Sequence, residues 1–256
     1  MSGVLVTGST DGIGLETART LLAQGLRVVV HARDERRADD VRAVLPDAAE
    51  VVVGDVASLA GTRALAEAAG KAGPFDVVVH NVGIGGGSPR TVTGDGLERI
   101  FQVNVLAPYL LTALLPLPRR LVYLTSGLQE RGTMRLDDLQ WETRPWDGMQ
   151  AYSDSKLHDV LLALAVARRF PDVVSNAVDP GWIRTRMGGP QATDDLPDGA
   201  GTQVWLAGSD EPDALVSGRY LKRRQVLTPN PAAVEVALQE RLLAECARLT
   251  GVPFPA

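Results

Sequence analysis

Near the beginning of the chain stands the stretch VLVTGSTDGIGLETA, residues 4–18. Its first letters form a short apolar run, which predicts a buried strand over residues 4–7, and its last letters begin a helical pattern. Gly8, Gly12 and Gly14 lie at the junction between the two. A glycine-rich turn at this place lets the backbone approach a pyrophosphate and offers it the free N–H groups of the helix start. The stretch therefore indicates a dinucleotide site; the alternative is a tight turn that needs glycine only for its own geometry.

The alternation of apolar runs with helical patterns continues along the chain. Besides residues 4–7, strands are predicted over residues 27–32, 49–53, 75–80, 121–126, 173–178 and 218–221. Helices are predicted over residues 13–23, 34–44, 58–70, 95–115, 149–170 and 232–249. Strand–helix–strand units with right-handed crossovers build a parallel sheet that helices cover on both faces. We therefore expect an α/β fold with a doubly wound parallel sheet, a single Rossmann-type domain over residues 1–256 with a C-terminal helix.

Composition and charge narrow the range of partners. The 256 residues are 45% apolar and 22% charged, which suits one compact domain. A net charge of −5 provides no positive field for phosphate backbones or anionic lipid, so neither nucleic acid nor a membrane surface is expected as a partner. Because the chain has three histidines and one cysteine, Cys246, we expect neither a metal site nor an internal disulfide.

The start of the chain and its apolar runs bear on localisation. No export leader precedes the first predicted strand, and no apolar run approaches the roughly 18 residues needed to cross a bilayer. We therefore expect a soluble protein of the cytoplasm, which is a reducing compartment.

Tyr152 and Lys156 lie four residues apart at the head of the predicted helix 149–170. Side chains at this spacing share one face of a helix, so a phenol and an ammonium become neighbours. The cation favours the phenolate, which makes the phenol a better proton donor to a carbonyl oxygen. An ordinary pair on a helix surface is the alternative.

Together, the glycine turn and the Tyr152–Lys156 pair resemble the short-chain dehydrogenase/reductase family in its compact single-domain branch, and the resemblance covers nearly the whole chain. Other marks of the family follow in order after the predicted strands: Asp55, Asn81-Val82-Gly83, Asn104, Ser126 and Pro180-Gly181. The resemblance implies a catalytic set of Asn104, Ser126, Tyr152 and Lys156. With the cofactor reasoning below, it implies cofactor contacts by Gly8, Ser9, Thr10, Gly12, Ile13, Gly14, Arg33, Arg37, Asp55, Val56, Asn81, Val82, Gly83, Tyr152, Lys156, Pro180, Gly181, Ile183 and Thr185.

The resemblance also implies a role for each catalytic residue, in a hydride transfer between a nicotinamide cofactor and a carbonyl or alcohol. The Ser126 hydroxyl would donate to the substrate oxygen, Tyr152 would hand over the proton, and Lys156 would assist the tyrosine and bind the nicotinamide ribose. Asn104 would hold a water that connects the lysine to solvent. The alternative for Asn104 is a polar residue that satisfies backbone groups of a helix.

The end of the predicted strand 27–32 bears on the choice between NAD and NADP. Relatives that prefer NAD carry a carboxylate at the position of Ala32 to bind the ribose 2′-hydroxyl, and here it is missing. Arg33 and Arg37 are placed to hold a 2′-phosphate with forked, charge-assisted hydrogen bonds. Three nearby carboxylates argue the other way: Asp11, Asp34 and Glu35. We expect NADP as the cofactor, with NAD less favoured.

The sequence departs from the family pattern at two places. His80-Asn81-Val82-Gly83 stands where the family usually has Asn-Asn-Ala-Gly, and a valine is bulkier where the backbone passes close to the cofactor. We interpret His80 as a packed residue at a strand end. The interval of 26 residues from Ser126 to Tyr152 is longer than usual, which is similar to the retinol-dehydrogenase-like and carbonyl-reductase-like branches with an inserted lid.

Two long segments, residues 127–150 and 182–199, interrupt the regular alternation. Loops of this length in a compact domain are usually lids or binding loops. Tryptophan and methionine gather in them, and we take Trp146, Trp182 and Met187 as candidate substrate contacts. This favours an aldehyde or ketone on a mostly apolar skeleton. The alternative is that these side chains anchor long loops to the body of the protein.

The sequence therefore predicts an NADP-dependent oxidoreductase that acts on a small, mostly apolar carbonyl or alcohol. A catalytically silent NADP-binding sensor or regulatory protein of the same fold is the alternative. An epimerase or dehydratase of nucleotide sugars would have a longer chain, and a serine hydrolase would need a Gly-x-Ser-x-Gly elbow, which the sequence lacks. Monomer and homo-oligomer both stay open.

Overall fold

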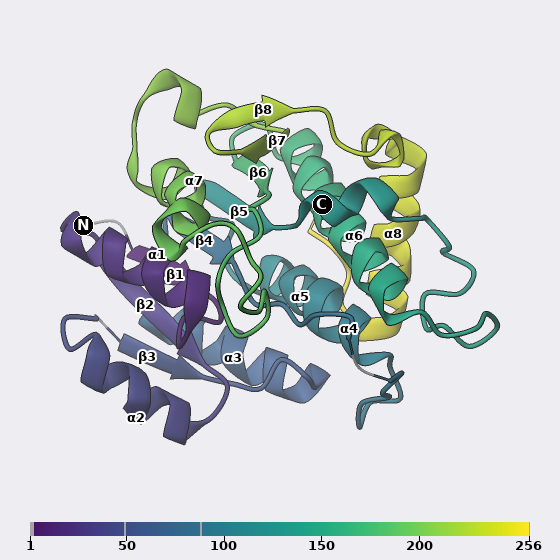
Figure 1. The fold of residues 1–256 in the computed structure, drawn as a ribbon, viewed down its shortest axis with the longest axis horizontal. Helices are drawn as coiled ribbons and strands as arrows, with labels where there is room; N and C mark the ends of the chain where they lie inside the picture. The colour runs from purple at the N-terminus through teal and green to yellow at the C-terminus, as the bar shows by residue number, and fades with distance from the viewer. Residues whose placement is uncertain (1–2, 49, 88, 256) are drawn as a thin grey trace.

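The structure is a computed structural model, and it describes residues 3–48, 50–87 and 89–255. Within these residues, eight strands form one sheet in the order β3-β2-β1-β4-β5-β6-β7-β8 (Figure 1). The strands are β1 (Gly3–Val6), β2 (Arg27–Ala32), β3 (Glu50–Val53), β4 (Val77–His80), β5 (Arg120–Leu124), β6 (Val174–Val178), β7 (Arg219–Lys222) and β8 (Gln225–Leu227). Ala49, with which the third predicted strand begins, lies outside the described residues.

The sheet has a switch point between β1 and β4. From β1 the chain winds outward to β2 and β3, then returns to β4 and winds outward on the other side as far as β7. Strands β1 to β7 pair in parallel, whereas β8 pairs antiparallel with β7. The predicted doubly wound parallel sheet is therefore confirmed. In such sheets ligands bind beyond the carboxyl ends of the strands at the switch point, here beyond β1 and β4.

Helices cover both faces of the sheet (Figure 1). The longer ones are α1 (Gly12–Ala23), α2 (Glu35–Val44), α3 (Leu59–Ala72), α5 (Ala107–Leu114), α6 (Gly148–Arg169), α7 (Leu196–Gly208) and α8 (Val236–Thr250). Because side chains alternate along a strand, Val4 and Val6 pack with α1, α2 and α7 on one face, and Leu5 packs with the remaining long helices on the other. The alternation explains why a strand of four apolar residues is buried throughout.

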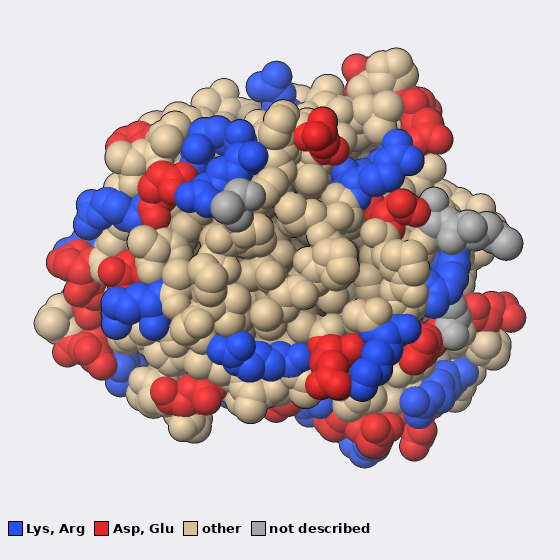
Figure 2. All heavy atoms as spheres, turned by 180° about the vertical axis from the view of Figure 1, so that it is seen from behind, with Lys and Arg blue, Asp and Glu red and all other residues tan. Residues whose placement is uncertain are grey.

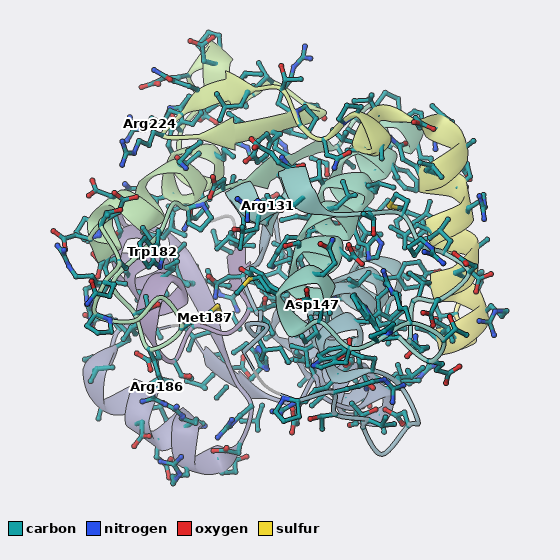
Figure 3. All side chains as sticks on the ribbon, turned by 45° about the vertical axis from the view of Figure 1, so that its right-hand side comes forward. Arg131, Asp147, Trp182, Arg186, Met187 and Arg224 are labelled. Carbon is teal, nitrogen blue, oxygen red and sulfur yellow. The ribbon has the colours of Figure 1, made fainter. Side chains whose placement is uncertain are left out.

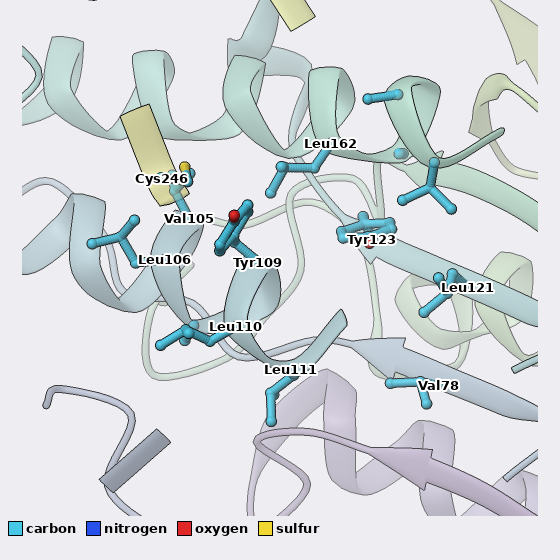
Figure 4. Packing of buried hydrophobic residues seen from close by; sticks show 14 of the residues in the cluster. Val78, Val105, Leu106, Tyr109, Leu110, Leu111, Leu121, Tyr123, Leu162 and Cys246 are labelled. Atoms are coloured by element: carbon cyan, nitrogen blue, oxygen red, sulfur yellow. The ribbon is translucent and has the colours of Figure 1, made fainter. Parts of the chain in front are cut away.

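The larger core lies between the sheet and the helices α3, α5, α6 and α8. Figure 4 shows Tyr109 of α5, Leu162 of α6, Cys246 of α8 and Leu121 of β5 in one cluster of buried side chains, and all four are essentially inaccessible to solvent. Each such side chain contributes roughly 1.5–3 kcal/mol by leaving water. This packing holds α5 and α6 rigidly against the sheet, and α6 carries the predicted site residues Tyr152 and Lys156.

The predicted helix 95–115 is wrong in detail. It is divided into a short turn α4 (Arg99–Phe101), a π-helical segment η1 (Gln102–Leu106) and the regular helix α5. Glu98 begins it, since its buried carboxylate accepts hydrogen bonds from the N–H groups of Ile100 and Phe101. The π-helical segment contains Asn104, and such bulges occur often at functional sites.

Three further elements differ from the sequence prediction. The predicted irregular segment 182–199 runs into the first turn of α7, a helix that the sequence pattern missed, and Asp195 and Asp198 form its capping box. Strand β8 was also missed. The predicted helix 232–249 begins as a short 3₁₀ turn, η4 (Pro231–Val234), and becomes α-helical only at Val236.

The surface carries charges of both signs. On the described part of the face shown in Figure 2, basic and acidic side chains are interspersed around a broad area without charged residues. Among the described residues no helix combines the length and the apolar character required to span a membrane.

Candidate active site

The glycine turn joins β1 to α1 in the geometry that its sequence predicts. Gly8 has a φ of +63°, a left-handed conformation that favours glycine. At Gly14 a Cβ atom would lie 2.4 Å from the Gly8 carbonyl oxygen and 2.4 Å from the Asn81 amide nitrogen, so only glycine lets α1 approach this closely. Asp11 caps the helix, because its side chain accepts a hydrogen bond from the N–H of Gly12.

The turn after β4 is tied to the glycine turn by Asn81. Its amide nitrogen donates to the carbonyl oxygens of Thr7 (2.8 Å) and Gly8 (3.1 Å), and its backbone N–H donates to the Thr7 hydroxyl. Val82 packs against the place where Gly8 has no side chain. The Val82 side chain is thus accommodated at Gly8. His80 is buried as expected, with its ring 4.7 Å from that of Tyr123.

His31 is a structural part of the turn that the sequence analysis missed. The Gly8 N–H donates to His31 Nδ1 at 3.0 Å, so Nδ1 is the acceptor and Nε2, 2.8 Å from the Gly54 carbonyl oxygen, carries the proton. Burial lowers the pKa of His31, which keeps this imidazole neutral. The available signal was a histidine inside the otherwise apolar strand VVVHA of residues 28–32.

The end of β2 leads into α2 through two of the candidate cofactor residues. Arg33 is exposed and pairs with Asp34 at 3.1 Å. Asp34 caps α2 by accepting the N–H of Arg37, and this hydrogen bond holds the pKa of Asp34 below its usual value. Ala32 is buried and brings no carboxylate to this edge. The Arg33 side chain is therefore exposed to solvent at the carboxyl end of β2.

The turn after β3 carries two further candidates. The Asp55 carboxylate accepts the N–H of Ala57 at 2.9 Å, which shapes the turn, while Val56 is buried. Both residues follow β3, beside β2 in the sheet, and so lie at the same edge as Arg33.

Tyr152 and Lys156 lie on the second turn and the third turn of α6, which Asp147 caps. The Lys156 side chain is buried, and its Nζ lies 5.8 Å from the centre of the Tyr152 ring. Nζ donates to the carbonyl oxygen of Leu124 at 2.9 Å and to the carboxylate of Asp159 at 2.8 Å. Burial opposes the charged form of Lys156, but the Asp159 carboxylate and Tyr152 together outweigh it and raise the lysine pKa. The structure therefore brings the predicted phenol and ammonium together and keeps the ammonium charged.

Ser126 and Asn104 flank this pair. Ser126 lies two residues beyond the end of β5 rather than within the strand, and its hydroxyl accepts the N–H of Leu128 at the start of η2 (Gly127–Arg131). Asn104 is buried; its carbonyl oxygen accepts the Ile84 N–H, and its amide donates to the Ile84 carbonyl oxygen and the Ser155 hydroxyl. The Asn104 side chain thus clamps the turn after β4 against α6. Gly83 lies in that turn, and a Cβ there would be 3.4 Å from Lys156 Nζ.

The segment after β6 is organised by Asp179, which sequence analysis also missed. Its buried carboxylate accepts the N–H of Gly181 and forms an ion pair with Lys222 at 2.9 Å. Pro180 and Gly181 therefore leave β6 in a fixed direction. The sequence feature that could have indicated this role is an acidic residue directly after a buried strand.

Residues 182–189 return toward the glycine turn. The Thr185 methyl group lies 3.3 Å from the position of a Cβ on Gly12, and Arg186 approaches Asp11 at 3.6 Å. Ile183 is buried at the base of this segment. The candidate cofactor residues after β6 are thus brought to the first turn of α1.

The three candidate substrate residues fall into two groups. Trp182 and Met187 are half exposed, and in Figure 3 they lie on the segment that faces the start of α6, marked by Asp147. Trp146 instead packs edge-on against the buried Trp141, so its placement favours anchoring of the 127–150 segment. Among the described residues no group of three metal-binding side chains gathers.

Comparison with known proteins supports one assignment. Residues 2–120 match the family model described as short chain dehydrogenase. Over the whole length of both chains, the protein is 40% identical to a short-chain dehydrogenase, chyC, of Penicillium rubens. The chain belongs to the short-chain dehydrogenase/reductase family. It is also 32% identical to human retinol dehydrogenase 13, over 99% of this chain and 86% of that protein.

Two solved structures share this fold. A crystal structure of an uncharacterized protein from Mycobacterium paratuberculosis matches with a TM-score of 0.87 and 28% identity, over 100% of this chain and 96% of that one. A blue fluorescent protein from a metagenomic library, in complex with NADPH, matches with a TM-score of 0.71 and 26% identity, over 86% and 95% of the two chains. As a member of this family, the protein is an oxidoreductase with a Rossmann-type nucleotide-binding fold, and its substrate is a small molecule.

Proposed function

We propose that the protein transfers hydride between NADP(H) and a carbonyl or alcohol on a mostly apolar small molecule. The observation that carries the proposal is the buried Lys156 ammonium beside Tyr152, at the carboxyl ends of the strands around the switch point. A reduced nicotinamide, when bound, supplies the hydride. The protein's own residues then have to bind, orient and deliver a proton.

The residues around the glycine turn fit a dinucleotide. Because Gly14 lets α1 approach the Gly8 turn closely, this turn and the start of α1 form a cradle that would offer backbone N–H groups to a pyrophosphate. Ser9, Thr10 and Ile13 belong to the same turn and would contribute to this cradle. Asn81 holds the cradle in place from β4.

NADP is the favoured cofactor because of the edge of β2. A carboxylate at position 32 would repel a 2′-phosphate, and the residue there is alanine. Arg33 would bind the phosphate with forked hydrogen bonds, and Arg37, one turn further on, would assist it. The NADPH in the related blue fluorescent protein supports this choice.

Proton transfer falls to Tyr152 in this proposal. Its phenol would donate to the carbonyl oxygen as negative charge develops there, and it would accept the proton in the reverse direction. The Lys156 ammonium stabilises the phenolate that remains, and the Ser126 hydroxyl would donate to the same substrate oxygen. Asn104 would contribute by clamping the turn that carries Gly83.

Segments 127–150 and 182–199 would form the substrate lid. The half-exposed apolar side chains of Met149, Trp182 and Met187 support an apolar substrate, because they lie at the start of α6 and on the segment that faces it.

The test is the loss of NADPH absorbance with a panel of apolar aldehydes and ketones, for the wild type and for Tyr152→Phe. We expect Tyr152→Phe to lower kcat by about 10²–10⁴-fold, since it removes the proton donor and leaves the ring. Tyr109→Phe is the matched control, because the Tyr109 hydroxyl bonds the Val252 carbonyl oxygen away from the site.

Equal rates for the wild type and Tyr152→Phe would overturn the assignment of the proton donor. Tight NADPH binding by the wild type without turnover of any carbonyl would instead identify a catalytically silent sensor.

A further inference from the structure

Asp159 lies next to the proposed catalytic pair, and the family resemblance assigns it no role. It follows Lys156 by three residues on α6, so the two side chains share one face of the helix. Both side chains are about 95% buried, and their charged groups meet at 2.8 Å. The pair is therefore a buried, hydrogen-bonded ion pair and not a contact on the helix surface.

The contacts of Lys156 account for two of its three N–H donors. One donates to the Leu124 carbonyl oxygen and one to the Asp159 carboxylate. Two anchors fix the direction of the ammonium group and leave one donor for a further partner. An ammonium without a negative partner at this depth would give up its proton, because burial disfavours the charged form.

The surroundings of Asp159 show which charges act on it. Lys156 faces it on its own helix, and the Tyr123 hydroxyl on β5 lies within its electrostatic reach while bonding Thr112 at 2.8 Å. The ring of His80 on β4 lies 4.7 Å from the ring of Tyr123. Burial raises the pKa of Asp159 to about 6, and the Lys156 ammonium opposes that rise. At neutral pH the carboxylate is charged and available to the lysine.

We propose that Asp159 is the positioning residue of the site, which holds Lys156 protonated and in a fixed orientation beside Tyr152. The activity part of this inference rests on the proposed function. The state of the lysine does not, so it can be measured without any substrate.

Asp154 provides a matched control on the same helix. Like Asp159, it is an aspartate of α6 that is 3% exposed and forms an ion pair, in this case with Arg144 at 3.0 Å. It also accepts hydrogen bonds from Thr133, at the base of the 127–150 segment. Asp154→Asn therefore matches Asp159→Asn in residue type, burial and loss of an ion pair, but it leaves Lys156 untouched.

The first experiment titrates Lys156 directly. The chain has three lysines, Lys71, Lys156 and Lys222, so protein labelled with ¹⁵N-lysine gives three Nζ resonances, which Lys71→Arg and Lys222→Arg assign. In Asp159→Asn the amide oxygen can still accept a hydrogen bond, but the charge is gone. We expect the titration midpoint of Lys156 to fall by about 2 pH units or more in Asp159→Asn, and to stay in place in Asp154→Asn.

The second experiment is the pH profile of carbonyl reduction. We expect Asp159→Asn to lower kcat by about 10-fold or more at pH 8 and to move the alkaline limb to lower pH, with the KM for the carbonyl within about twofold. A residue that only supports the fold would change the unfolding temperature and leave the alkaline limb in place, as we expect for Asp154→Asn.

The outcomes separate the two proposals. A Lys156 midpoint unchanged in Asp159→Asn overturns the role of Asp159, whether or not the protein is active. A shifted midpoint in a wild type that reduces no carbonyl supports the role of Asp159 and overturns the proposed function. If Asp159→Asn does not fold, the wild-type protein provides the test, in which the Lys156 Nζ resonance is followed while the Asp159 carboxyl group titrates. A Lys156 shift that changes together with the Asp159 carboxyl carbon supports the pairing. A Lys156 shift that stays constant during this titration overturns the pairing.

Discussion

At the scale of single residues, the proposed preference for NADP over NAD depends on Arg33. Its guanidinium lies at the exposed end of β2, where it forms an ion pair with Asp34. An exposed pair of this kind contributes little to stability, so Arg33 can exchange partners at small cost. A phosphate with two negative charges would compete well for it.

We expect Arg33→Ala to weaken NADPH binding by about 10–100-fold and to leave NADH binding nearly unchanged, because a charge-assisted hydrogen bond is worth about 1.5–3 kcal/mol. Fluorescence titration of each cofactor measures this. Arg36→Ala is the control, since Arg36 is also exposed and pairs with an aspartate, Asp40. An equal loss for both cofactors would contradict the proposed preference for NADP.

His31 and Asp179 show a second feature at this scale. Neither touches substrate in the proposed mechanism, yet each ties a loop of the site to the sheet. Both side chains hold these loops because they are buried beside backbone groups of the loops. The neighbouring residues in the sequence do not indicate which backbone groups these are.

At the scale of the elements, the contact between α1 and the glycine turn depends on the absence of one methyl group. A Cβ at Gly14 would lie 2.4 Å from the backbone oxygen of Gly8, which has no room to move aside. Gly70 is also helical, in α3, but a Cβ there would meet no atom within 4 Å. A larger side chain is therefore excluded at Gly14 and has room at Gly70.

We expect Gly14→Ala to lower the free energy of unfolding by about 1–3 kcal/mol, through overpacking against backbone. Gly70→Ala should raise it by about 0.5–1 kcal/mol, because alanine favours the helix. Urea unfolding of both variants measures the difference. A neutral effect of Gly14→Ala would mean that α1 can withdraw from the turn.

At the scale of the whole molecule, stability is coupled to pH through buried histidines. Burial lowers the pKa of all three: His31, His80 to about 3 and His158 to about 4. The unfolded chain takes up protons at these sites near pH 6.5, whereas the folded protein does not, so folding becomes less favourable as the pH falls below about 6.5. Burial raises the pKa of Asp159 to about 6 and that of Glu98 as well, which partly offsets the effect.

We expect the free energy of unfolding to fall between pH 6.5 and pH 5, by about 1.4 kcal/mol per pH unit for each proton that remains unbalanced. Urea unfolding at several pH values measures the slope, and His158→Gln should make it shallower by one proton. Stability that rises toward pH 5 would show that the carboxyl groups outweigh the histidines.

The glycine turn, the first six strands and the Tyr152–Lys156 pair were predicted because their signals are local: glycine at a turn, apolar runs, and two side chains one helical turn apart. Helix α7 was missed because its glycines and its proline hide the helical pattern, although its own capping box supports it.

The amino-acid sequence by itself determined the doubly wound sheet, the place of the nucleotide turn and the presence of a phenol beside an ammonium. Only the tertiary structure decided which polar groups are withdrawn from water together: His31 with Gly8 and Gly54, Asn104 with Ile84, and Lys156 with Leu124 and Asp159. The physical reason is that local propensity acts over a few residues, whereas burial depends on elements that are far apart in the chain, and burial sets the charge and direction of these groups.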